Sequence, residues 1–372
     1  MTVGAGATYD DNLFRLPAGQ TPTGLRSASR SDFFWNAFVD GQAYLPVSRQ
    51  VLRAGLTLAT NGYQNYSFLN YQAVNGSAAW DWRIGSRFSG TLSYTQLQAL
   101  SSFIDLRSFV RNINTVRIAS AENEFWMLPD WHLTAGVAST RVDNSDEALS
   151  FAKLDETAAD AGIKYVTYAQ NYVKLYWREA WGKYPDQQVV AGSFFDNRYD
   201  QTDVTLEYFQ APTGASQVIA RLAYTERRSP NLPQRNFSGP TGRLSWVYAA
   251  TGKLGFEALG RREIGAYTDL VSNYIVTDAV GVTPYWRVTG KLRVDASVER
   301  QRRDYRGDPS FVLTNQPAEH DLLTFWRLST TYDLAFRWKA VAGWQHSSRS
   351  SNVHGLGFSE QSVYASVQYK WD

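Results

Sequence analysis

The last twelve residues of this chain restrict its fold more than any other stretch. From Gln361 to Asp372 an apolar residue takes every second position, at Val363, Ala365, Val367, Tyr369 and Trp371. A period of two gives an extended strand one apolar and one polar face. Thr2–Tyr9, near the other end of the chain, alternates in the same way. Both ends therefore predict strands of the same kind.

The same alternation recurs between these two strands, in segments of about 10–14 residues. We expect eighteen strands, near 2–9, 33–45, 51–60, 69–83, 87–98, 109–126, 131–142, 157–168, 172–182, 199–210, 217–228, 241–250, 253–262, 274–287, 291–302, 320–332, 336–346 and 361–372. Tight turns, such as Gly85-Ser86 and Asp333-Leu334, alternate with long polar loops, such as 10–31 and 99–108. Nine long and eight short connections are what eighteen strands need when both termini lie on the short-turn side.

This pattern is typical of bacterial outer-membrane barrels, which have short periplasmic turns and longer outer loops. We predict one all-β domain over residues 1–372, a transmembrane antiparallel up-and-down β-barrel whose last strand closes against the first. The mean hydropathy of -0.37 suits a barrel, since only alternate residues face lipid. No run approaches the roughly 18–20 apolar residues of a membrane helix. The alternative, a β-propeller, needs a repeat of about 40–50 residues, and none is visible.

Tryptophans gather near the predicted strand ends, as the aromatic girdles at the two membrane interfaces require. They are Trp131, Trp177, Trp181, Trp286, Trp338, Trp344 and Trp371. We therefore predict a location in the bacterial outer membrane, in contact with lipid and lipopolysaccharide. The residues after Met1 form neither the basic region nor the apolar core of a signal peptide. We expect the sequence to be a mature chain whose signal peptide is removed; a cytosolic protein is the alternative.

Most charged residues of the strands alternate with the apolar set, and barrels of about 16–18 strands are wide enough for an aqueous channel. The inferred lumen carries many cations and fewer acids. Its candidate contacts for a polysaccharide are Arg53, Arg87, Tyr172, Lys174, Tyr176, Arg178, Arg221, Arg243, Lys291, Arg293, Arg327 and Arg337. Guanidinium groups bind carboxylates and tyrosines stack on sugar faces. Alternatively, the cations only pair with acids: Asp203, Glu207, Glu257, Asp295 and Glu299.

Some stretches leave their structure open. In 109–126 and 274–287 both faces carry apolar residues, so alternation does not fix the register. Glu299–Arg306, which reads ERQRRDYR, is strongly basic, and we expect it to begin a long loop. Such a loop could contact lipopolysaccharide phosphates or an emerging acidic chain. The simpler alternative is a solvated loop.

Catalytic and cofactor signals are weak. The chain has no cysteine, which excludes disulfides and thiolate metal sites, and no two of its four histidines have metal-ligand spacing on one strand. His346 and His354 flank a loop with several serines, so a Ser-His pair for acyl hydrolysis is conceivable. We expect no enzyme, no cofactor, no metal and no nucleic-acid partner.

The most distinctive stretch follows the first strand and reads TYDDNLFRLPAGQ, from Thr8 to Gln20. Asp10 and Asp11 are expected to fold the first loop, since Asp side chains bond backbone groups in turns. Around Tyr9–Arg15 the stretch resembles the start of the exosortase-associated (PEP-CTERM-associated) exopolysaccharide outer-membrane proteins of the EpsL type, a group of porin-like barrels. The resemblance implies export of a secreted exopolysaccharide and a periplasmic polysaccharide-export protein as partner. It carries over no catalytic or pore residue.

Three functions follow as hypotheses. The first is a monomeric channel that lets a secreted polysaccharide cross the outer membrane passively. The alternative is a general or solute-specific diffusion porin, and the third is an outer-membrane hydrolase. A diffusion porin should have a constriction made by an inward-folded loop, whereas an exporter should be plugged or gated.

Overall fold

The computed structural model describes residues 1–106, 108–185, 189–190, 193–194, 198–230, 233, 236–266, 274–306 and 318–371. Eighteen strands form one sheet: β1 (Thr2–Asp10), β2 (Asp32–Val47), β3 (Gln50–Tyr63), β4 (Tyr71–Ile84), β5 (Phe88–Leu100), β6 (Ile113–Trp126), β7 (Trp131–Asn144), β8 (Leu154–Val166), β9 (Tyr172–Lys183), β12 (Tyr199–Thr213), β13 (Ser216–Arg228), β14 (Phe237–Tyr248), β15 (Leu254–Ala266), β16 (Tyr274–Arg287), β17 (Leu292–Arg306), β18 (His320–Ala335), β19 (Trp338–Ser351) and β20 (Phe358–Lys370). The connections hold two short 3-10 helices, η1 (Ser67–Leu69) and η2 (Glu147–Ala152), and a small hairpin of β10 (Val189–Val190) and β11 (Ser193–Phe194). No helix in these ranges is long and apolar enough to cross a bilayer.

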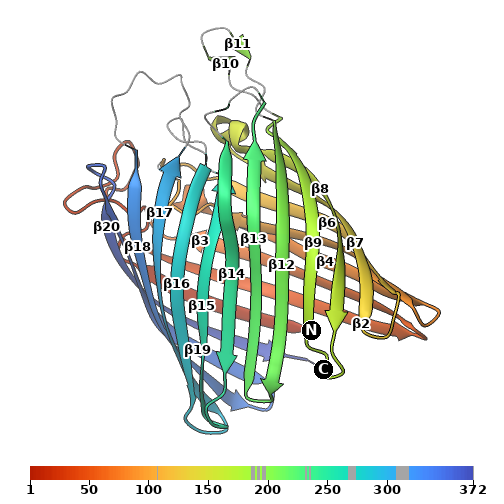
Figure 1. Ribbon diagram of the computed structural model, residues 1–372. Coiled ribbons are helices and arrows are strands. Elements are labelled where there is room, and N and C mark those ends of the chain that lie inside the picture. Colours follow the sequence, from red (N-terminus) through yellow and green to blue (C-terminus); the bar gives the residue numbers. More distant parts are fainter. Residues whose placement is uncertain are drawn as a thin grey trace.

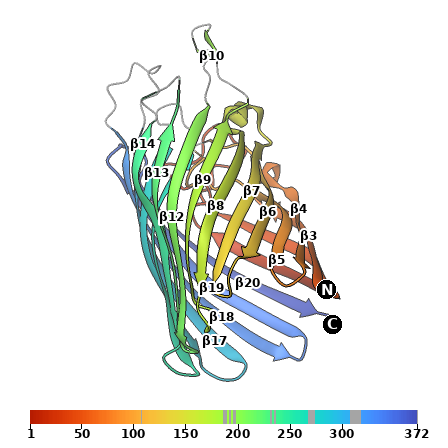
Figure 2. The same ribbon diagram turned by 45° about the vertical axis from the view of Figure 1, so that its right-hand side comes forward.

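The sheet closes on itself because its first strand is paired on both sides. Ala5 of β1 lies opposite Ala37 of β2 and opposite Val367 of β20. β9 pairs directly with β12, so the small hairpin between them does not interrupt the barrel. The amino group of Met1 donates to the carbonyl of Trp371 over 3.2 Å, and the two termini lie side by side in both views (Figures 1 and 2). The predicted closed antiparallel barrel is confirmed.

Long and short connections alternate as predicted, and the termini lie at the short-turn end (Figure 1). Two predicted boundaries were wrong. The turn after β18 is Phe336-Arg337, because a bulge after Asp333 lets the ladder continue to the pair Ala335 and Trp338. Glu299–Arg306 is strand and not loop, because both neighbouring strands pair with it as far as Asp304.

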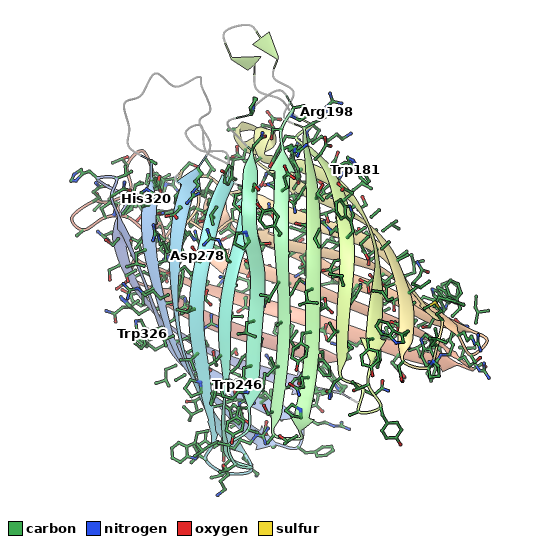
Figure 3. The ribbon with its side chains drawn as sticks, in the orientation of Figure 1. Trp181, Arg198, Trp246, Asp278, His320 and Trp326 are labelled. Atoms are coloured by element: carbon green, nitrogen blue, oxygen red, sulfur yellow. The ribbon has the colours of Figure 1, made fainter. Side chains whose placement is uncertain are left out.

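The outer face is apolar and ringed by tryptophans. All seven tryptophans predicted for the girdles are exposed. Trp181 lies near the long-loop end and Trp246 near the short-turn end (Figure 3). A closed barrel with this outer surface leaves no unpaired sheet edge to lipid, as a membrane-spanning sheet requires.

The two strands with open registers, β6 and β16, are fixed by cross-strand contacts. Ser120 of β6 bonds Ser93 of β5 over 2.8 Å in the lumen, so Ile118 also faces inward and Arg117 outward. Asp278 of β16 pairs with Arg262 on the outer face. The alternation of apolar and polar residues did not reveal the register of these strands for two reasons. Ile118 of β6 is an apolar residue that faces the lumen. Arg117 of β6 and Asp278 of β16 are charged residues that face outward near the long-loop end.

Candidate functional site: the lumen

The lumen contains a cavity of about 1070 Å³ that reaches the short-turn end of the barrel. The wall from β8 to β13 supplies its most strongly charged part. Five candidates from the sequence line it together, namely Tyr172, Lys174, Tyr176, Arg178 and Arg221. Strand alternation brings them together, since Tyr172, Lys174, Tyr176 and Arg178 take every second position of β9 and Arg221 faces inward from β13.

The cations of this wall are interleaved with acids from neighbouring strands. Arg178 donates to Glu156 over 2.8 Å and to Asp203 over 3.1 Å. Arg221 donates to Glu207 over 2.9 Å, and Lys174 lies 3.9 Å from Asp160. Each pair joins strands that lie next to each other in the sheet, so the pairs also fix the geometry of the wall.

Tyrosines complete the wall and leave their ring faces to cations. The Tyr172 hydroxyl donates to Glu207 over 2.7 Å, and the Tyr199 hydroxyl donates to Glu156 over 2.5 Å. The ammonium of Lys164 lies 4.7 Å from the centre of the Tyr172 ring, and that of Lys174 lies 4.5 Å from the Tyr176 ring. These cation–π contacts hold the two lysines against the wall.

At several pairs of the lumen wall the arginine is more exposed than its carboxylate. The Arg221 side chain is 61% exposed, whereas that of its partner Glu207 is 16% exposed. The same order holds for Arg53 with Asp81 and for Arg293 with Asp295. A guanidinium has five N–H donors, so an exposed arginine keeps donors for a ligand after it has satisfied its own acid.

The other sequence candidates divide into two groups. Arg53, Arg243, Arg293 and Arg327 face the lumen from the strands, and within the described ranges no acid pairs with Arg243 or Arg327. Arg87, Lys291 and Arg337 lie in short turns outside the strands, so their placement on the lumen wall is corrected. For Arg337 the cause is the misplaced turn after β18; it donates to the Tyr369 hydroxyl over 3.5 Å.

The predicted excess of cations over acids in the lumen is also corrected. Inward positions carry many acids that the sequence reading did not count, among them Asp40, Asp81, Glu122, Glu124, Glu156, Asp160, Glu263 and Asp321. Most of them lie opposite small or polar residues, where alternation alone gives no sign of a partner. The lumen therefore has no surplus of basic residues; the cation is the more exposed member at Arg221, Arg53 and Arg293, whereas Glu263 is more exposed than Arg261.

The distinctive stretch after β1 folds into a hydrogen-bonded clasp at the long-loop end. Asp10 accepts from the backbone N–H of Asn12 and from the Arg15 guanidinium, both over 2.8 Å. The side chain of Asn12 bonds both backbone groups of Leu16 and the carbonyl of Ser359. Asp11 accepts from the N–H of Gln361 in β20 over 2.8 Å. The prediction that Asp10 and Asp11 fold this loop is confirmed.

Phe14, at the tip of this clasp, joins three loops in one apolar cluster. Its ring meets the rings of Tyr66, Phe103 and Phe109 edge-on, with centroids 4.7 to 4.9 Å apart. Leu13 and Leu69 complete the buried core of the cluster. Burial raises the pKa of the Tyr66 hydroxyl, which stays protonated and donates to the carbonyl of Ser29.

The loop between β5 and β6 reaches the far wall of the barrel; we call its described residues, 101–106 and 108–112, the crossing loop. Asp105 accepts from Arg303 of β17 over 2.6 Å, and the Ile104 carbonyl accepts from Arg349 of β19 over 2.9 Å. From β5, the shorter way to β17 passes β4, β3, β2, β1, β20, β19 and β18, almost half of the eighteen strands. Both arginines face inward near the long-loop end, so the crossing loop spans the lumen there.

Below the crossing loop a second cavity of about 470 Å³ lies against the opposite wall. Arg15 and Ile104, one from each inward loop, line it together with Arg261, Glu299 and Arg327. Arg261 bridges Glu299 over 2.8 Å and Glu263 over 3.0 Å. Both inward loops therefore border this cavity.

Among the described residues no serine is hydrogen-bonded to His346 or His354, the histidines considered for hydrolysis. Ser347 faces inward and donates to Glu360 over 2.5 Å, whereas His346, its neighbour in the strand, faces outward. Consecutive strand residues point to opposite faces, so these two cannot act together. Among the residues described, no group of three His, Cys, Asp or Glu side chains could hold a metal ion.

Several lumen residues were missed by the sequence reading. Lys164 and Asp160 of β8 are four residues apart, so they lie on the same face of the strand. This spacing could have placed Lys164 in the lumen from the sequence. Arg349 and Asp321 form a buried pair at 3.6 Å. No local sequence signal marks this pair. Arg349 also donates to the Ile104 carbonyl of the crossing loop, which is more than two hundred residues away in sequence.

Comparison with known proteins places the fold. No protein-family model matches the chain, and no curated protein matches its sequence. The crystal structure of the outer membrane protein OpdK from Pseudomonas aeruginosa is similar at 13% identity and a TM-score of 0.53, covering 100% of this chain and 98% of that chain. Pseudomonas aeruginosa OpdK with vanillate gives 13% identity, the same coverage and a TM-score of 0.52. Pseudomonas aeruginosa OccK2 (OpdF) in complex with glucuronate gives 11% identity and a TM-score of 0.54, covering 99% and 97%.

These similarities show a shared fold, the closed antiparallel barrel of outer-membrane channels. Together with the apolar outer face, they place this chain in the bacterial outer membrane. None of the three is an exosortase-associated protein, and the resemblance carried by Thr8–Gln20 finds no support in them. It remains a prediction.

Proposed function

We propose that this protein is a solute-selective diffusion channel of the outer membrane that passes small solutes bearing a carboxylate, without a cofactor and without catalysis. The observation that carries the proposal is the exposure of Arg221, Arg243 and Arg327 on the lumen wall, where Glu207, the partner of Arg221, is mostly buried. Guanidinium groups bind carboxylates through two parallel hydrogen bonds, which favours such solutes over neutral ones.

Two further observations support a diffusion channel over the other candidates. The crossing loop folds into the lumen, which is the constriction expected of a porin. Two of the similar structures hold vanillate and glucuronate, and each of these small molecules has a carboxylate. Export of an exopolysaccharide stays a prediction from the resemblance alone.

The test is ion selectivity and solute flux of the purified barrel. In planar bilayers under a salt gradient the wild type should conduct and prefer anions, and liposomes should take up glucuronate faster than glucose. Arg221→Gln with Arg243→Gln should lower both preferences. A matched control, Arg141→Gln with Arg228→Gln, removes two arginines of the outer face and should change neither.

A barrel that does not conduct, or that prefers cations, would refute the proposal. Polymer trapped in the periplasm of a deletion strain, together with a non-conducting barrel, would establish the exporter instead.

A further inference from the structure

The basic stretch ERQRRDYR, expected as a loop, places arginines on the outer face of the barrel. In β17, Gln301, Arg303 and Tyr305 face the lumen, while Arg300, Arg302 and Arg306 face outward. Arg262 of β15 joins them, because Asp278 of β16 lies opposite both Arg262 and Arg302 in the ladder. We call Arg262, Arg300, Arg302 and Arg306 the outer arginine patch.

Acids compensate this patch only in part. Asp304 accepts from His320 over 2.8 Å and Arg302 over 3.2 Å, and it lies 3.5 Å from Arg306. Asp278 pairs with Arg262 at 3.2 Å. Four arginines against two aspartates leave a formal excess of two positive charges, with the histidine neutral.

The patch keeps hydrogen-bond donors that nothing in the described chain uses. Arg300 is exposed, and no acid among the described residues pairs with it. The side chain of Arg302 is 66% exposed although it bonds Asp304. The side chain of Arg262 is 41% exposed beside Asp278. Exposed guanidinium groups of the patch therefore remain within reach of an anion.

Apolar surface begins directly below the patch. Arg300 lies opposite Val280, and the next outward position down β17, Val298, lies opposite Val282 and Trp326. Val280, Val282, Trp326, Leu328 and Trp344 are all exposed. Figure 3 shows Asp278 and His320 near the long-loop end and Trp326 on the outer wall below His320.

The position of the patch selects its ligand. Arginine on the lipid face is strongly destabilising at the bilayer midplane and is tolerated near the interfaces, so the patch belongs at headgroup level. The long-loop end is the outer leaflet. A ligand that satisfies both surfaces carries phosphates above several acyl chains.

Outward arginines elsewhere on the barrel lack these features. Arg141 pairs with Asp155 at 2.7 Å and Arg228 with Glu226 at 2.6 Å. Arg117 also pairs with its own acid, Asp143. There each arginine has a carboxylate of its own, so outward arginines alone do not make a patch.

From these observations we infer that the outer arginine patch binds the phosphates of lipopolysaccharide, with the acyl chains lying on the valines and tryptophans below. Guanidinium forks bind phosphate oxygens bidentately. The site binds one lipid of the outer leaflet in a fixed place and is separate from the passage through the lumen.

The test measures binding of lipid A to the detergent-purified barrel by native mass spectrometry. Wild type should retain bisphosphorylated lipid A through detergent exchange and should lose dephosphorylated lipid A. Arg300→Gln with Arg302→Gln should weaken binding of the bisphosphorylated form by about tenfold or more, as expected when two charge-assisted contacts are lost. The matched control, Arg141→Gln with Arg228→Gln, should bind as wild type does.

Heat-modifiable gel mobility shows that each variant is folded, and bilayer conductance should not change in either. Equal binding of the two lipid A forms, or equal binding by wild type and the Arg300/Arg302 variant, would overturn the inference. Inorganic phosphate that displaces lipid A at equimolar concentration would show that the site takes free phosphate and would also overturn it.

Discussion

At the two ends of the lumen the same chemical pair, arginine with carboxylate, is placed in different surroundings. At the long-loop end Arg349 and Asp321 are almost fully buried, and Arg15 lies with Asp10 and Glu360 beneath the inward loops. At the short-turn end Arg221 and Arg53 stand half exposed, each beside a cavity of the lumen. The difference teaches that burial decides the role: the buried pairs hold loops in place, and the exposed pairs present charge to a solute.

Breaking the buried pair should have the largest effect. Arg349→Ala leaves the Asp321 carboxylate buried without its cation and frees the Ile104 carbonyl of the crossing loop. The expected cost in unfolding free energy is about 3–5 kcal/mol, measured by urea-induced unfolding in liposomes. Single-channel conductance should rise, because the loop loses an anchor on the far wall. The exposed Arg141→Ala serves as the control, and equal behaviour of the two variants would contradict the comparison.

The clasp at the first loop should be the next most sensitive. Asn12→Ala removes a buried side chain that bonds both backbone groups of Leu16 and the Ser359 carbonyl. Leaving such groups without partners costs about 1–3 kcal/mol, and the same unfolding measurement reports it. Asn75→Ala, in a half-exposed position of the lumen wall, should cost clearly less. A cost for Asn12→Ala no greater than for Asn75→Ala would show that the clasp is not what holds the loop.

A half-exposed pair should matter for selectivity and little for stability. Arg221→Gln should change the unfolding free energy by less than about 1 kcal/mol, since solvent screens its pair with Glu207. The reversal potential should shift toward cations, because Glu207 is then uncompensated. A large loss of stability without a shift in reversal potential would reverse the assigned roles.

Raising the salt concentration should produce the smallest change in channel behaviour. It should affect the exposed arginine pairs at the short-turn end and leave the buried pairs at the long-loop end unaffected. Between 0.1 and 1 M salt the screening length falls from about 10 to about 3 Å. The anion preference of the exposed arginines should decline over this range, whereas the buried pairs should keep the crossing loop in place. Single-channel conductance divided by bulk conductivity should therefore fall as surface charge is screened and show no sudden rise. An abrupt rise at high salt would mean that screening releases the loop.

The strands themselves could be predicted from the sequence, because a barrel wall separates lipid from water along every strand. Because successive side chains of a strand face lipid and lumen in turn, apolar and polar residues alternate with a period of two along the sequence. The strand count, the alternating connections and the inward face of β9 with Lys174 and Arg178 follow from it. Prediction failed where the wall has no such contrast. At β6, Ile118 faces the lumen, and near the long-loop end ERQRRDYR continues as strand at headgroup level, above the apolar part of the outer face.

What the sequence determined by itself is therefore the barrel, its closure and which residues face inward over most of its wall. Only the tertiary structure decided which charges are exposed, that Phe14 and the crossing loop meet inside the lumen, and that four arginines gather on one outer wall. The physical reason is distance along the chain. Alternation depends on neighbours two residues apart, whereas burial and ion pairing at the mouth depend on partners such as Ile104 and Arg349, which only the closed barrel brings together.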